Sequence, residues 1–93
     1  MSKPSSNSWQ VMIERRAEKV MRRLDKSLRK RLDNAIQALA NNPYPSNSRK
    51  LVGKSNHYRL RVGDWRIIYT IRQQVMVILV VKIAPRDKAY NKK

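Results

Sequence analysis

The chain has 93 residues and a net charge of +16, from 22 Lys and Arg against 6 Asp and Glu. Its 41% apolar content is typical of one small folded domain, and its charge favours a polyanionic partner, with nucleic acid as the first candidate. Because it has no cysteine and one histidine, disulfides, thiolate metal sites and paired-histidine catalysis are excluded.

The first half of the chain predicts a strand followed by two helices. Residues 1–8 are polar, form no secretory signal and are expected to be a loose leader, whereas residues 9–13 are rich in strand formers. From Glu14 the apolar residues take the period of a helix, and the predicted buried side consists of Ala17, Val20, Met21 and Leu24. Asp25 is expected to cap a second helix, which ends at Asn41-Asn42-Pro43. Its predicted buried stripe is Leu28, Leu32, Ala35, Ile36 and Leu39.

A hairpin is predicted in the second half, where two alternating runs flank Gly63-Asp64, a pair suited to a two-residue turn. The resulting register places Val62 opposite Trp65 and Arg61 opposite Arg66. One face then carries the apolar residues Tyr58, Leu60, Val62, Trp65, Ile67 and Tyr69. The other face carries three arginines, namely Arg59, Arg61 and Arg66. We interpret the nine basic residues between positions 15 and 31 as solvated helix surface.

The remaining segments complete an α+β fold. Residues 41–48 are predicted as a loop, residues 49–54 are basic with one glycine, and Gln73-Gln74 is a weak turn. Residues 75–81 are apolar on both faces, which predicts a central strand, and residues 84–93 form a polar tail. We therefore expect one domain over residues 1–93, in the order β-α-α-β-β-β. Its two helices would pack on a mainly antiparallel four-stranded sheet. No apolar run reaches the length of a membrane helix, so a cytoplasmic protein is expected.

The arginine-bearing side of the hairpin indicates an anionic ligand, because arginines that face each other across two strands repel. Residues 49–93 contain only Asp64 and Asp87 as carboxylates, so a two-metal site is not expected. RNA carries its own nucleophile, the 2′-hydroxyl, and guanidinium groups can orient and stabilise the phosphate that it attacks. Arg is a poor base, so a Tyr or Lys would have to assist proton transfer, and such an enzyme should be slow on free RNA. We read His57 as a loop or strand-edge residue, and Trp9 and Trp65 as core rather than base-stacking residues, together with Tyr69.

Three motifs occur in order: Lys50-Leu-Val-Gly53, Tyr58-Arg-Leu-Arg-Val-Gly-Asp-Trp-Arg-Ile-Ile-Tyr69, and Arg86-Asp-Lys-Ala-Tyr90. This combination resembles the RelE toxins of the RelE/ParE superfamily. The resemblance implies a catalytic set of Arg59, Arg61, Arg66, Arg86 and Tyr90, with RNA contacts from Lys50, Lys54 and Lys88. The sequence departs from the family at Arg59 and Arg61, where the best-known members carry lysines. Pro85 stands where many relatives have histidine.

The resemblance also implies a function and partners. It implies a toxin that cleaves messenger RNA in the ribosomal A site without metal or cofactor, paired with a co-encoded antitoxin, and we expect that antitoxin to be acidic. In this hypothesis Arg61 and Arg66 bind the scissile phosphate, Arg86 stabilises the transition state and Arg59 orients the 2′-hydroxyl. Tyr90 stacks on a base or assists proton transfer. Two alternatives remain open: a ParE-type toxin that acts on DNA gyrase, and a non-toxic module that binds RNA or the ribosome.

Overall fold

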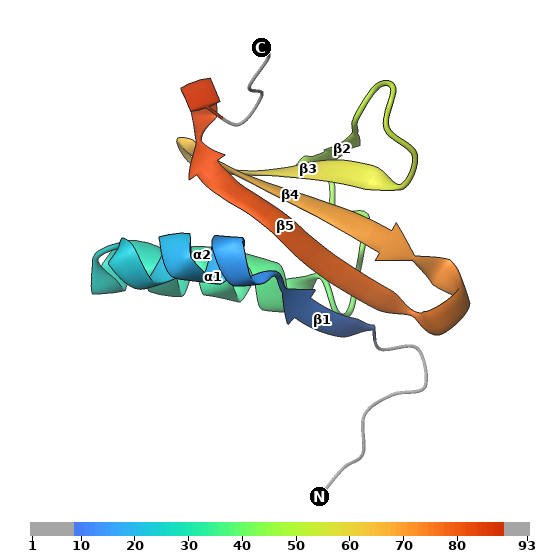
Figure 1. Cartoon of the computed structure of the whole chain (residues 1–93), viewed down its shortest axis with the longest axis horizontal. Helices are drawn as coiled ribbons and strands as arrows, with labels where there is room; N and C mark the ends of the chain where they lie inside the picture. Colours follow the sequence, from blue (N-terminus) through green and yellow to red (C-terminus); the bar gives the residue numbers. More distant parts are fainter. Residues whose placement is uncertain (1–8, 89–93) are drawn as a thin grey trace, which may run out of the picture.

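The fold is a sheet with two helices on one side, seen in a computed structural model that describes residues 9–88 (Figure 1). The strands are β1 (Gln10–Ile13), β2 (Ser48–Lys50), β3 (His57–Val62), β4 (Trp65–Arg72) and β5 (Val77–Pro85). The helices are α1 (Arg15–Arg23) and α2 (Lys26–Ala38), and two short 3-10 helices are η1 (Gln73–Val75) and η2 (Arg86–Lys88). The sheet order is β1-β5-β4-β3-β2, with β1 parallel to β5 and the other neighbours antiparallel. The predicted α+β class is confirmed, with five strands rather than four.

Both helices bury the stripes that their apolar spacing predicts. Ala17 and Met21 are buried on α1, and Leu32 and Ile36 are buried on α2. The carboxylate of Asp25 accepts from the Leu28 N–H at 3.5 Å, which is the predicted cap of α2. All nine basic residues between positions 15 and 31 are exposed except Arg29, which is half-buried. Neither helix in residues 9–88 is long and apolar enough to span a membrane.

The β3–β4 hairpin has the predicted turn and the predicted register. Val62 lies opposite Trp65, and Arg61 lies opposite Arg66. Gly63 has φ +60° at the first central position of the turn, where a type II′ turn requires glycine. Of the six residues predicted for the core-facing side, Leu60, Ile67 and Tyr69 are buried, while the other three are half-buried against the same core. The alternation of side chains across the two strands therefore separates an apolar face from an arginine face.

Two strand boundaries differ from those predicted. The short strand β2 falls in residues predicted as loop and basic linker, because three residues at a sheet edge are too few to show an alternating pattern. The strand β5 is central as predicted, with β1 and β4 as its neighbours, but it runs from Val77 to Pro85 instead of 75–81. Its start is delayed by η1 and by Met76, whose φ of +53° turns the chain. Its end is extended because β4 pairs with it as far as Pro85, so the predicted tail begins inside the strand. The predicted leader and residues 89–93 of the tail lie outside the described residues.

Tyr69 joins the sheet to the loop that follows α2. Its ring is fully buried and stacks on Tyr58 at a centroid separation of 5.7 Å. Its hydroxyl donates to the Pro43 carbonyl at 2.7 Å. Burial raises the pKa of Tyr69 because it disfavours the phenolate, and the neighbouring Tyr58 and Tyr44 add to that rise, whereas a hydrogen bond with Ser48 opposes it.

We predict that Tyr69→Phe lowers the free energy of unfolding by about 1–2 kcal/mol at neutral pH, because the buried Pro43 carbonyl loses its donor. The raised pKa gives the effect a pH dependence. The stabilisation by Tyr69 is complete below its unfolded-state pKa of about 10 and is lost as the pH rises through the higher folded-state pKa. Urea unfolding should therefore show the difference between wild type and variant shrinking above about pH 10. A difference that stays constant with pH would contradict this account.

Candidate functional site

The side of the sheet away from the helices carries a cluster of arginines, which we name the arginine face. It consists of Arg49 on β2, Arg59 and Arg61 on β3, and Arg66 on β4. Residues that lie opposite each other on antiparallel strands point to the same side, so the pairs Arg49–Arg59 and Arg61–Arg66 define this face. Ile68 lies on it too, between Arg59 and Lys82, and is only 6% exposed although no helix covers it. We attribute this burial to the aliphatic stems of its long neighbours.

Arg66 is held by the turn that precedes it. Its Nη1 donates to the carbonyls of Gly63 and Trp65, both at 2.9 Å. The pKa of Arg66 lies below the usual value for arginine, first because its guanidinium is partly removed from water, and then because of neighbouring positive charges. These charges belong to Arg61, Arg59 and Arg86, and Asp64 acts in the opposite sense. Arg66 is thus half-buried and lies near the positive charges of three other arginines.

The end of β5 brings Arg86 to the same turn. The last ladder pair of β4 and β5 is Trp65 with Pro85, and the Arg86 backbone N–H then donates to the Asp64 carbonyl at 2.8 Å. Arg86 itself is exposed. The structure therefore brings together four of the residues predicted from the sequence, Arg59, Arg61, Arg66 and Arg86.

The other predicted residues are placed differently. Lys50 lies opposite Tyr58, on the core-facing side of the sheet rather than on the arginine face. Lys54 is exposed in the loop between β2 and β3. Lys88 belongs to η2, and Tyr90 lies outside the described residues. Lys50 and Lys54 are therefore not gathered with the four arginines.

Arg49 is a residue of the arginine face that the sequence reasoning missed. It neighbours Lys50 in the sequence, but only the β2–β3 register shows that Arg49 is the one facing Arg59. The sequence does not indicate β2, because a strand of three residues is too short to show an alternating pattern of apolar and polar side chains. Two pairs of directly opposed arginines now occupy one surface, and each opposed pair costs stability. A bound polyanion would remove that cost, since guanidinium groups bind phosphate oxygens in bidentate fashion.

The guanidinium groups determine which chemistry the arginine face can perform. Within residues 9–88 no group of three or more His, Cys, Asp and Glu side chains lies together that could hold a metal ion. The guanidinium groups can bind and orient phosphate and can stabilise negative charge that develops on it. They are poor proton acceptors, so a general base must come from another group.

We predict that Arg61→Gln raises the free energy of unfolding at low salt by about 0.5 kcal/mol, because it removes the repulsion with Arg66. The gain should shrink at about 1 M salt, where screening is strong. Lys50→Gln is the matched control, since it removes one positive charge opposite a tyrosine. Chemical denaturation at both salt concentrations measures the effect, and an Arg61→Gln protein no more stable than the control would contradict the repulsion.

Comparison with known proteins gives the family. The family model for the ParE toxin of the type II toxin–antitoxin system parDE matches residues 11–90. RelE1 of Methanocaldococcus jannaschii is 31% identical over 86 residues, which cover 89% of this chain and 96% of that protein. These matches span nearly the whole chain.

Solved structures agree with this assignment. The archaeal RelE–RelB complex from Pyrococcus horikoshii matches with a TM-score of 0.78 and 30% identity, over 88% of this chain and 99% of that one. The isolated RelE toxin of Escherichia coli has a TM-score of 0.76 over 88% of each chain, and at 19% identity it shows the shared fold alone. The chain therefore belongs to the ParE toxin family of type II toxin–antitoxin systems and is a RelE-like toxin of the RelE/ParE superfamily.

Proposed function

We propose that this toxin is a metal-independent endoribonuclease that cleaves messenger RNA in the ribosomal A site and so inhibits translation. The observation that carries the proposal is that Arg59, Arg61 and Arg66 share one side of the β3–β4 hairpin and that the end of β5 brings Arg86 to the turn of that hairpin. A phosphodiester bound there would meet several cationic donors, and its own 2′-hydroxyl could attack the phosphorus in line. The protein would act in the cytoplasm, where its partners, messenger RNA and ribosomal RNA, are found.

Each arginine has a proposed role that follows from its position. Arg66, whose orientation the turn carbonyls fix, binds the scissile phosphate together with Arg61 on the opposite strand. Arg86, placed by its backbone bond to Asp64, stabilises the charge that develops in the transition state. Arg59, which lies two pairs along the ladder from Arg61–Arg66 and on the same side of the sheet, orients the 2′-hydroxyl. In this proposal residues 1–93 act as one toxin domain, and the tail from position 84 completes the site through Tyr90, which stacks on a base or assists proton transfer.

In the proposed reaction, proton transfer is the step to which the four arginines contribute least. The arginines stay protonated despite the lowered pKa of Arg66, and so they supply charge and geometry rather than a base. Much of the rate must then come from how the RNA is held, since correct orientation alone can lower a barrier strongly. A ribosome that presents the message in a fixed shape would supply that orientation, which supports cleavage of translated rather than free RNA.

An antitoxin is the second proposed partner. The solved structures similar to this chain include complexes of RelE with RelB. The net charge of +16 favours an acidic antitoxin segment, and the opposed arginine pairs give such a segment a place to bind. An antitoxin bound on the arginine face would compete directly with RNA.

We predict that Arg86→Ala reduces cleavage of a translated message at least about 100-fold and relieves growth arrest, because one donor to the transition state is lost. Arg66→Ala should do the same, but it also removes two bonds to the turn, so its unfolding curve must be compared with wild type. Arg23→Ala on the exposed side of α1 is the charge-matched control. Primer extension on a translated message, with and without induction, measures the cuts.

Other results of that experiment would identify the alternatives. Undiminished cleavage by folded Arg66→Ala and Arg86→Ala proteins would refute the site. Growth arrest with intact messages and an SOS response would favour action on DNA gyrase, an alternative to which the ParE description of the matching family lends weight. Expression of wild type without growth arrest would indicate a non-toxic binding module.

We predict that Arg49→Glu weakens binding of the co-encoded antitoxin by about tenfold or more, because it reverses a charge on the arginine face. Lys50→Glu makes the same change of charge one residue away, on the other side of the strand, and should change the affinity about twofold or less. Titration calorimetry with the purified antitoxin measures both. Equal losses in the two variants, or a native complex that lacks an acidic protein, would contradict the proposed interface.

A further inference from the structure

The turn of the β3–β4 hairpin is also approached from the helix layer, by Arg31 of α2. A Cβ atom placed on Gly63 would lie 2.6 Å from Nη2 of Arg31, which is shorter than the distances at which real Cβ atoms meet a neighbour. The guanidinium group therefore packs against the backbone of Gly63, in space that a glycine leaves open. In Figure 1 the first turns of α2 lie at the same end of the molecule as this hairpin turn. Arg31, expected from the sequence to be solvated helix surface, thus lies beside the proposed RNA site.

The two sides of the sheet meet at this turn, because the strands end there. Arg66 donates from its Nη1 to the Gly63 carbonyl at 2.9 Å. Arg31 reaches the same residue from the helices, so no strand separates the two guanidinium groups. Since both groups pack on one residue, their nearest nitrogens lie within about 9 Å of each other. An RNA backbone bound at Arg66 can therefore pass over the turn to Arg31.

The charge around the turn is mostly positive. Arg61 lies opposite Arg66 on the ladder, Arg86 is bound to the turn through its backbone, and Asp64 is the carboxylate of the turn itself. Within residues 9–88, Arg31 forms no ion pair with Asp64 or with another carboxylate. The charges that lower the pKa of Arg66 belong to other arginines of the site and not to Arg31. Arg31 therefore lies beside the Arg61–Arg66 pair rather than within it, where it can meet a second anionic group.

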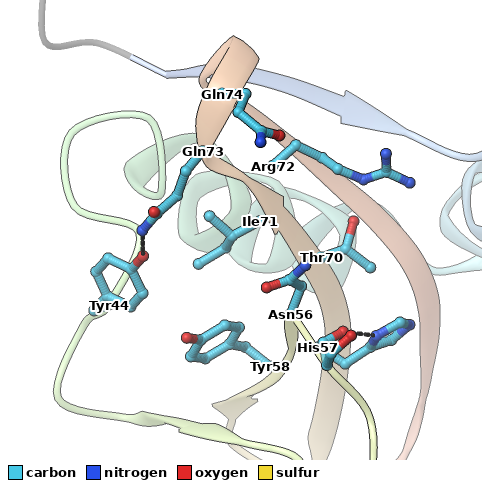
Figure 2. A pocket seen from close by; sticks show the side chains of 10 residues that line it. Tyr44, Asn56, His57, Tyr58, Thr70, Ile71, Arg72, Gln73 and Gln74 are labelled. Carbon is cyan, nitrogen blue, oxygen red and sulfur yellow. Dashed lines mark hydrogen bonds between the residues drawn. The ribbon is translucent and has the colours of Figure 1, made fainter.

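The opposite end of the hairpin is a less suitable extension of the site. A pocket of about 590 Å³ lies there, between the loop after α2, the loop before β3 and the end of β4 (Figure 2). Figure 2 shows Tyr44 on one side of Ile71 and Arg72 on the other, so the strand separates the exposed ring from the cation. Arg72 is also six residues along β4 from Arg66, a distance of about 20 Å. Arg31 is much closer to the proposed position of the scissile phosphate.

We propose that Arg31 binds the RNA phosphate next to the one held by Arg61 and Arg66, so that the strand crosses the turn of the hairpin toward α2. A guanidinium group that already packs on the turn loses less conformational freedom on binding than one extended into water. The contact is to the RNA backbone, so it positions the strand without reading its sequence. The inference rests on the proposed function, because its ligand is the same RNA strand.

The experiment compares two short RNAs that differ by one phosphate, a dinucleoside monophosphate and a trinucleoside diphosphate. Both carry 2′-O-methyl groups so that neither can be cleaved, and NMR titration of the full chain at low salt measures each dissociation constant. Arg31→Gln should weaken binding of the trinucleoside diphosphate about tenfold and that of the dinucleoside monophosphate about twofold or less. Arg31→Lys should retain most of the affinity, because it keeps the positive charge. Lys30→Gln is the matched control, since it removes one charge from the adjacent exposed position of α2, and it should leave both affinities unchanged.

Three results would overturn the inference. Equal losses with the two RNAs would mean that Arg31 acts through the shape of the turn and not through a second phosphate. Unchanged binding of both RNAs by Arg31→Gln would mean that Arg31 does not contact RNA. A weaker antitoxin complex with unchanged RNA binding would assign Arg31 to the antitoxin interface.

The proposed function can fail separately. If the two RNAs respond equally to Arg31→Gln while wild type still cuts translated messages, the second phosphate contact is refuted and the proposed function stands. If Arg31→Gln affects the trinucleoside diphosphate selectively but wild type cuts no message, the phosphate contact stands and the proposed function fails.

Discussion

The register of the β3–β4 hairpin is the constraint on which the rest of this structure depends. Side chains alternate along a strand, so a slip of one residue would turn Leu60 and Ile67 out of the core and the arginines into it. The two-residue turn with Gly63 at φ +60° prevents that slip. Once the register is fixed, the burial of one face sets the position of every arginine on the other, and β5 and β2 extend the pattern on either side.

The arginine face shows that burial and electrostatics act against each other across a single sheet. Apolar residues on the helix side provide the favourable free energy of folding, while the opposed pairs Arg49–Arg59 and Arg61–Arg66 reduce it. A protein can keep such repulsion only if its core tolerates the loss, because net stability is small compared with the terms that compose it. The small core of this chain therefore limits how many like charges the binding surface can hold.

The sequence predicted those features that rest on a period or on a turn residue. The helical stripes, the cap at Asp25 and the hairpin at Gly63 each follow from local chemistry, and each occurs as predicted. What it could not predict depends on partners distant in the chain. Strand β2 forms only because β3 offers an edge, and Arg49 joins the arginine face through that pairing. The pocket lined by Tyr44, Asn56 and Ile71 forms where the loop after α2 lies beside the end of β4, and these two segments come from different halves of the chain.

The bond between the Arg86 N–H and the Asp64 carbonyl has a consequence for how such toxins can diverge. It joins backbone to backbone, so it places position 86 beside the turn whatever side chain either residue carries, short of proline at 86. Location and chemical identity are thereby uncoupled at this position. A lineage could exchange the guanidinium for an imidazole, an amine or an inert group in one mutation, with the scaffold unchanged, and so acquire a new reactivity or an inactive descendant without having to refold.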